Sequence, residues 1–186
     1  MIPAPTRLLT AAILAAATLL AVPAGAQAPR SAGPIIADYG TVFAVPDPDL
    51  ATPLTTPLKV DFDVSSAAEK PDQVNAGIET AARFLNMHAQ AGVPPANLFV
   101  GMVLHGGAAK DALSNEAYRR RFGTDNPNLP LIEALVKAGA RIYLCGQSAA
   151  SRGITKADMA TPVKLALSAM TAHMVLQIDG YHVNPF

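Results

Sequence analysis

The chain has 186 residues, enough for one domain of ordinary size. Its 14 basic and 14 acidic side chains cancel, and a near-neutral chain lacks the basic surface needed to bind nucleic acid or an anionic membrane. Aromatic residues make up only 5% and there is no Trp, which argues against a stacking platform for bases or sugars.

The first residues predict a cleavable signal peptide, residues 1–26. Arg7 precedes an uncharged apolar run over residues 8–22, and the small residues that follow form an A-x-A cleavage pattern. The competing interpretation is a membrane anchor, but the run is shorter than the roughly 20 residues that a spanning helix needs. We expect a mature chain that begins at Gln27, carries 13 basic and 14 acidic residues, and is periplasmic or secreted without membrane attachment.

Residues 27–57 predict an extended arm. They hold six prolines, and proline removes a backbone donor and restricts the residue before it. Ile35, Ile36 and residues 39–45 are apolar enough to pack. We therefore expect the arm to lie across the domain or across a neighbouring subunit. Since apolar surface of that kind usually ends at a subunit contact, we expect a homo-oligomer.

Residues 58–186 predict an α/β domain. Alternation over residues 59–64 predicts a strand with its valines and phenylalanine on one face and its aspartates on the other. Apolar residues at helical spacing then predict a helix that begins at Pro71 and ends at Gly92. Residues 98–104 form a nearly continuous apolar run, typical of a strand buried on both faces.

The same alternation of strand and helix continues to the end of the chain. Its spacing is typical of βαβ units, whose right-handed crossovers give a parallel sheet with helices on both faces. The expected elements are a helix at 115–122, a helix capped by Asn128 and ended by Gly139, a strand at 141–145, a strand at 163–167, a helix at 170–179 and a short strand at 181–185.

Cys145 is the only cysteine, so no intramolecular disulfide can form. An unpaired thiol in an exported protein is either buried and inert or reactive. Here it precedes Gly146, Gln147 and Ser148, whose backbone N–H groups favour a thiolate and suit a nucleophile or a persulfide carrier. The alternative is a buried, small apolar side chain at the end of a strand.

A second motif follows the strand at 98–104. Functional loops gather at the carboxyl ends of parallel strands, so His105 and Cys145 face one cleft if their two strands are neighbours. A histidine that only hydrogen-bonds within a turn is the alternative. The residues expected to contact a ligand in this cleft are His105, Gly106, Gly107, Gly146, Gln147 and Ser148.

We expect no metal and no cofactor. His88, His173 and His182 lack the spacing of zinc ligands, and a site from His105 and Cys145 alone would lack further ligands. The two glycines after His105 lack a G-x-G-x-x-G context, so a dinucleotide site is not indicated.

Five segments stand out along the chain: KVDFDV at 59–64, ARFLNMH at 82–88, VLHGGA at 103–108, DNPN at 125–128 and LCGQSA at 144–149. Together they resemble the DsrE/DsrF-like family, in particular its exported branch, and the resemblance covers roughly residues 35–186. It implies a three-layer α/β/α sandwich with a parallel, five-stranded Rossmann-like sheet and assembly into trimers or hexamers. It also implies a cysteine after a sheet strand that carries sulfane sulfur as a persulfide, matched by Cys145.

Three classes of function follow. The first is an exported sulfur carrier or sulfurtransferase that acts through Cys145, with unidentified donor and acceptor proteins. The second is a non-catalytic module that binds a small molecule or anion in the cleft between His105 and Cys145. The third is a structural oligomer in which Cys145 belongs to the core.

Overall fold

A five-stranded parallel sheet forms the centre of the computed structural model, which describes residues 29–185; the expected signal peptide and Gln27 lie outside the described residues. The strand order is β6-β5-β4-β3-β7, and every neighbouring pair is parallel. The strands are β3 (Leu58–Val64), β4 (Leu98–Leu104), β5 (Arg141–Cys145), β6 (Lys164–Ala166) and β7 (His182–Asn184).

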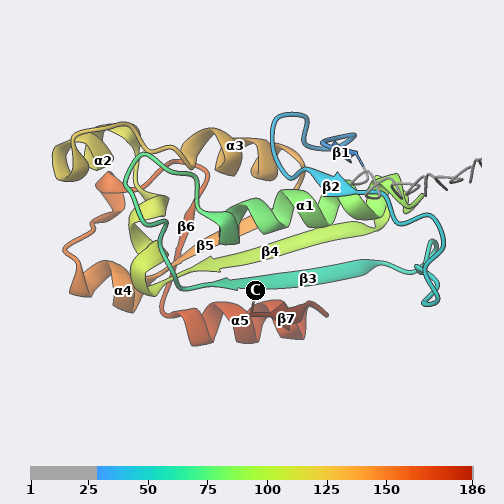
Figure 1. Ribbon diagram of the computed structural model, residues 1–186. Coiled ribbons are helices and arrows are strands. Elements are labelled where there is room, and N and C mark those ends of the chain that lie inside the picture. Colours follow the sequence, from blue (N-terminus) through green and yellow to red (C-terminus); the bar gives the residue numbers. More distant parts are fainter. Residues whose placement is uncertain (1–28, 186) are drawn as a thin grey trace, which may run out of the picture.

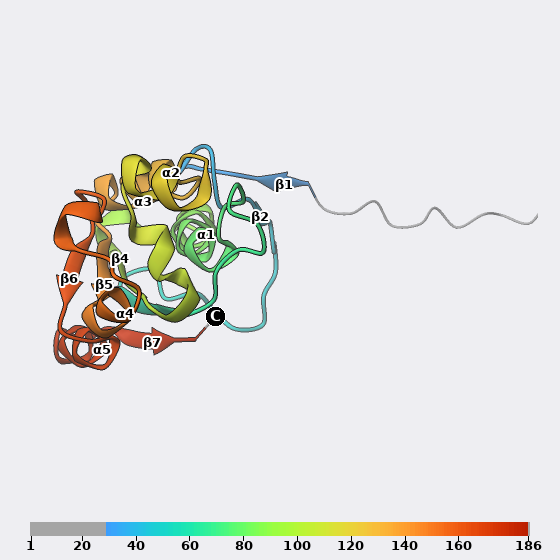
Figure 2. The ribbon, with the colours of Figure 1, turned by 90° about the vertical axis from the view of Figure 1, so that its left-hand side faces the viewer.

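Helices cover both faces of this sheet. Figures 1 and 2 show α1 (Ala76–Gln90), α2 (Asn115–Phe122) and α3 (Leu129–Lys137) on one side and α5 (Ala169–Ile178) on the other, while α4 (Gly146–Ser151) follows β5 without a loop. The predicted three-layer α/β/α fold with a parallel sheet is thus confirmed. Within residues 29–185, no helix is both long and apolar enough to cross a membrane.

The core divides into two parts because alternate residues of a strand point to opposite faces of the sheet. The larger part lies between the sheet and α1 to α3 and includes Phe62, Ile78 and Leu135. The smaller part lies under α5 and consists of Val103, Ala172, Leu176 and Tyr181. In β4, a Cβ at Gly101 would come within 2.9 Å of the Leu176 side chain, so glycine there lets α5 approach the sheet.

The sequence placed the start of α1 wrongly. The helix begins at Ala76, because the Asn75 side chain accepts the N–H of Gly77 at 2.9 Å and so caps it, whereas Pro71 lies in a preceding turn. Asn128 occupies the expected N-cap position of α3, but its side chain makes no capping bond. Instead, its Oδ1 accepts the backbone N–H of Asn75 at 2.7 Å, which ties the starts of the two helices together.

The described part of the arm packs on α1. Its strands β1 (Arg30–Ser31) and β2 (Val42–Phe43) form a small antiparallel pair, and Ile36 is buried in the larger core. Asn86 of α1 is fully buried and holds the arm through five hydrogen bonds. It accepts the N–H groups of residues 35 and 36 and donates to the carbonyls of residues 36, 39 and 40.

Candidate functional site

Cys145 ends β5 and directly precedes the first turn of α4. Its residue is 5% exposed, so the thiol is almost covered. The site is nevertheless at the carboxyl edge of the sheet, where the last residues of the parallel strands meet the loops that follow them. Cys145 therefore combines the burial of a core residue with the position of a functional one.

The surroundings of the Cys145 sulfur favour the thiolate. Burial raises the pKa of the thiol, but hydrogen bonds outweigh that effect and bring the pKa below its ordinary value. These bonds come from the backbone N–H and the hydroxyl of Ser148 and from the backbone N–H groups of Ala169 and Gln147. Donors from the starts of both α4 and α5 thus converge on one sulfur atom.

The structure brings the two predicted motifs together. Strands β4 and β5 are parallel neighbours in register, so His105 and Cys145, which occupy equivalent positions at their ends, lie side by side. The backbone N–H of Gly106 donates to the Ser148 hydroxyl at 3.1 Å, which joins the loop after β4 to the first turn of α4. The same hydroxyl faces the Cys145 sulfur, so it links both motifs to the thiol.

The glycines of both motifs are required by close backbone packing. A Cβ at Gly146 would lie 2.5 Å from the carbonyl oxygen of Ala166 and 2.9 Å from that of Leu167. Gly106 has a φ of +51°, and a Cβ there would lie 2.8 Å from the carbonyl oxygen of Ser65. Their first role is therefore to let adjacent loops meet.

The remaining two expected ligand contacts lie at the rim of this region. A Cβ at Gly107 would lie 3.1 Å from the backbone nitrogen of Ala67, so this glycine also lies close to a neighbouring loop. Gln147 is exposed, and its amide nitrogen lies 3.4 Å from the carbonyl oxygen of Leu167. Gln147 is thus free to meet solvent or a bound molecule.

A cluster of two aspartates and two histidines lies beside Cys145, and sequence reasoning missed it. His105 Nε2 is 2.5 Å from Asp63 Oδ1, and His173 Nε2 of α5 is 3.3 Å from the same oxygen. His173 Nδ1 is 2.6 Å from Asp61 Oδ2. We refer to Asp61, Asp63, His105 and His173 as the Asp–His cluster.

Hydrogen bonds to one buried and one partly exposed carboxylate favour the protonated form of His173. The bond to Asp61 raises the pKa of His173, burial opposes it, and the charges of Asp61 and Asp63 add to the rise. Asp61 is fully buried, and its Oδ1 has no hydrogen-bond partner in the described part of the chain. The only signal in the sequence was a pair of aspartates on one face of a strand, which a covering helix turns into a buried site.

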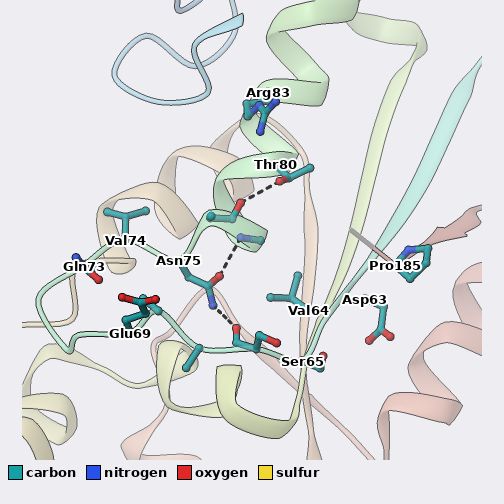
Figure 3. Close-up of a pocket in the computed structure, with 15 residues that line it drawn as sticks. Asp63, Val64, Ser65, Glu69, Gln73, Val74, Asn75, Thr80, Arg83 and Pro185 are labelled. Carbon is teal, nitrogen blue, oxygen red and sulfur yellow. Dashed lines mark hydrogen bonds between the residues drawn. The ribbon is translucent and has the colours of Figure 1, made fainter.

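A pocket of about 630 Å³ has Asp63 as one of its lining residues (Figure 3). It is formed by the end of β3, the loop over residues 65–75, the first turns of α1 and Pro185, with Arg83 at one side. Neither Cys145 nor His105 lines it. The pocket therefore shares one carboxylate with the Asp–His cluster and does not contain the thiol.

No group of three or more His, Cys, Asp or Glu side chains within residues 29–185 is arranged to hold a metal ion. In the Asp–His cluster, each ring nitrogen that faces a carboxylate oxygen is close enough for a direct hydrogen bond. The region places a thiol beside side chains that can carry protons.

Comparison with known proteins agrees with this architecture. A solved structure of MTH1491 from Methanobacterium thermoautotrophicum, described as a protein of unknown function, is similar with a TM-score of 0.51 and 14% identity, over 69% of this chain and 99% of that one. The ychN protein from E. coli gives a TM-score of 0.48 and 14% identity over the same shares. At 14% identity the likeness to MTH1491 concerns the fold alone.

No curated protein sequence matches the chain. The sequence profile of the DsrE/DsrF-like family matches residues 59–185, which is more than half of the chain. The match contains all of β3 except Leu58, all of β4 to β7, Cys145 and the whole Asp–His cluster. The protein belongs to the DsrE/DsrF-like family.

Proposed function

We propose that this protein is a sulfur-relay protein that carries sulfane sulfur as a persulfide on Cys145. The observation that carries the proposal is the convergence of N–H donors and one hydroxyl on the Cys145 sulfur, which lowers the pKa of the thiol despite its burial. Membership of the DsrE/DsrF-like family supports the proposal, because resemblance to that family implies a persulfide-carrying cysteine and Cys145 matches its position. A thiolate is the form of cysteine that attacks sulfur.

The transfer needs no external oxidant. The Cys145 thiolate attacks the outer sulfur of a donor persulfide, R–S–SH, and forms a new S–S bond. The S–S bond of the donor breaks, and its electron pair stays on the departing thiolate, R–S⁻, which takes up a proton. The protein now holds Cys145–S–SH, and the reverse sequence passes the outer sulfur to an acceptor thiol.

Mass spectrometry after treatment with polysulfide tests the proposal. The wild-type chain is expected to gain about 32 Da for each sulfur atom bound. Chains with Cys145→Ser, or with Cys145 alkylated beforehand, are expected to gain nothing. Failure of the folded wild-type protein to gain mass would exclude the sulfur-carrier function.

The burial of Cys145 favours one alternative, a core cysteine in a protein whose oligomer is structural. The two functions predict opposite effects of Cys145→Ser. A carrier loses sulfur loading and keeps its melting temperature, because the change is nearly isosteric. A core cysteine loses about 1–3 kcal/mol of stability, because a buried hydroxyl without a partner is costly, and shows no loading in the wild-type chain.

We further propose that the protein forms a homo-oligomer of trimeric or hexameric type. The arm is a weaker reason for this than the sequence indicated, because Ile36 and Val42 are buried against the arm's own domain. A stronger reason is α5, which is apolar on its outer face as well. The exposed apolar side chains there and next to it are Leu165, Leu167, Met170, Met174, Val175 and Ile178.

Light scattering with matched variants tests this assembly. Wild-type protein at micromolar concentration is expected to have a multiple of the monomer mass, and Met174→Glu is expected to reduce it. Met87→Glu changes an exposed methionine of α1 and serves as the control. A monomeric wild-type protein would contradict the proposal.

The proposed compartment is the periplasm or the exterior of the cell. It rests on the sequence of residues 1–26, with the charge, apolar run and small residues of a signal peptide. Sequencing the N-terminus of the exported protein is expected to give Gln27. An intact Met1 in a membrane fraction would instead indicate an anchor.

A further inference from the structure

The Asp–His cluster forms a continuous line of hydrogen bonds that runs from β3 to α5, back to β3 and on to the residue after β4. It begins at Asp61, which is fully buried, and passes through His173, whose side chain is 16% exposed. It continues through Asp63 and ends at His105, next to the strand that carries Cys145. Such a line orders its members, because each side chain has a fixed partner.

The positions of the carboxylates determine where the protons are. Both ring nitrogens of His173 face carboxylate oxygens, which accept hydrogen bonds, so this arrangement favours a ring that carries a proton on each nitrogen. Asp63 Oδ1 also lies 2.5 Å from His105 Nε2, so that nitrogen carries a proton. In a neutral His105 ring the free lone pair is therefore on Nδ1.

His105 and Cys145 share one edge and one face of the sheet. The His105 ring is bound to Asp63, which is bound to His173 of α5, so the ring lies on the face covered by α5. The Cys145 side chain lies on the same face, because Tyr143, two residues earlier in β5, packs against the core under α5. Neighbouring parallel strands are about 4.8 Å apart, which makes the ring and the thiol neighbours.

The thiol has donors around it, but its proton needs an acceptor. The hydrogen bonds to the sulfur come from three N–H groups and the Ser148 hydroxyl, all of which donate to a thiolate. Within residues 29–185, His105 Nδ1 makes no hydrogen bond, although Nε2 of the same ring is held by Asp63. A nucleophile, a neighbouring base and a third group that orients the base are the parts of an activated nucleophile.

We propose that His105 is the proton acceptor of Cys145 and that Asp63, held in place by His173 and Asp61, is the positioning residue that keeps the free lone pair of His105 on Nδ1. The proposal rests on the sulfur-carrier function and deepens it. The S–H bond of Cys145 breaks as an N–H bond forms at Nδ1, and the thiolate attacks the outer sulfur of R–S–SH. As the S–S bond of the donor breaks, R–S⁻ takes the proton from Nδ1, which restores neutral His105.

The titratable groups around His105 and Cys145 come from β3, α5 and β5. Asp61 and Asp63 of β3 face His173 of α5, and Asp63 also faces His105, so a positive charge formed on His105 during transfer meets a carboxylate. Cys145 of β5 completes the set.

The test compares three variants of the cluster and two control variants with the wild-type chain. His105→Gln removes the acceptor, Asp63→Ala removes the positioning group, and Asp63→Asn restores an oxygen without its charge. The control His182→Gln changes an exposed histidine of β7, and the control Asp72→Ala changes an exposed aspartate. For each, the rate of persulfide loading of Cys145 is measured across pH, together with the melting temperature.

At neutral pH we expect His105→Gln and Asp63→Ala to load about tenfold more slowly or worse, Asp63→Asn to be intermediate, and both controls to match the wild-type chain. Well above the ordinary pKa of a thiol, about 8.5, solvent removes the proton, and all variants are expected to load at similar rates. Nitrogen NMR of wild-type protein is expected to place the proton of neutral His105 on Nε2, with a mixture of tautomers in Asp63→Ala.

Other results would overturn either the proton-transfer role of His105 or the sulfur-carrier function. Equal loading rates in wild-type, His105→Gln and Asp63→Ala at neutral pH would overturn the proton-transfer role and leave the sulfur-carrier function intact. Rates reduced equally at every pH, with a lowered melting temperature, would show that the cluster is only structural and would also overturn it. A wild-type chain that never loads sulfur would overturn the sulfur-carrier function, and this inference with it.

Discussion

Replacing Asn86 with alanine tests how the arm is held on the domain. Asn86 is fully buried in α1, and its amide makes five hydrogen bonds to the arm at distances from 2.9 to 3.2 Å. Alanine lacks this amide, so the substitution removes all five hydrogen bonds at once. The backbone groups of the arm then either stay buried without partners or leave the domain to reach water.

The structure sets the size of the effect. A hydrogen bond contributes about 0.5–1.5 kcal/mol net, so five of them give an upper range of about 3–7 kcal/mol. Detachment of the arm limits the loss, because its backbone groups can then bond to water, at the cost of exposing Ile36. We therefore expect a loss of about 3 kcal/mol, a large part of the 5–15 kcal/mol that stabilises an ordinary domain.

Thermal and denaturant unfolding, combined with hydrogen exchange, measure this loss. About 3 kcal/mol corresponds to a drop of roughly 6–12 °C in melting temperature for a chain of this size. The amides of Ile35 and Ile36 are expected to lose protection, since Asn86 Oδ1 is their acceptor. Asn97→Ala removes a single, more exposed amide bond to the Leu54 carbonyl and is the control. A loss below about 1 kcal/mol, equal to that of the control, would refute the reasoning.

Three further predictions concern the site. His173→Asn should destabilise the fold most below about pH 6.5, where His173 is protonated and its ion pairs are complete. The loss of stability should shrink as pH rises through the raised pKa of His173, so the melting temperatures of variant and wild-type protein should converge at alkaline pH. Gly146→Ala should cost about 1–3 kcal/mol and slow alkylation of Cys145, because its Cβ would meet the Ala166 carbonyl oxygen at 2.5 Å. Ser148→Ala should move alkylation of Cys145 to higher pH, because the thiolate loses a donor, and should cost about 1 kcal/mol in unfolding experiments; unchanged alkylation would contradict the assigned role of the hydroxyl.

Much of the fold follows from local patterns. The runs at 98–104 and 141–145 coincide with β4 and β5 because buried parallel strands are apolar throughout. The helix expected at 115–122 is α2, with its stop at Gly123, where φ is +77°. The start of α1 was missed because a proline resembles a helix start even where it lies in a turn.

The site was only partly predictable. The meeting of the two motifs follows from adjacent parallel strands, whose ends lie at one edge. The Asp–His cluster does not follow, because His173 is 112 residues away from Asp61 and 110 from Asp63 along the chain. Alternation in β3 puts both aspartates on the face opposite its apolar side chains. Only the packing of α5 over the face that carries the aspartates buries Asp61.

The pH dependence of Cys145 alkylation tests the central claim most directly. Cys145 is the only cysteine, so intact mass after brief exposure to iodoacetamide reports on this thiol alone. If hydrogen bonds to the sulfur outweigh its burial, the folded wild-type protein should be alkylated with a midpoint below the ~8.5 of a free thiol. A midpoint at or above that value, or a folded protein that is not alkylated at any pH, would contradict a reactive Cys145.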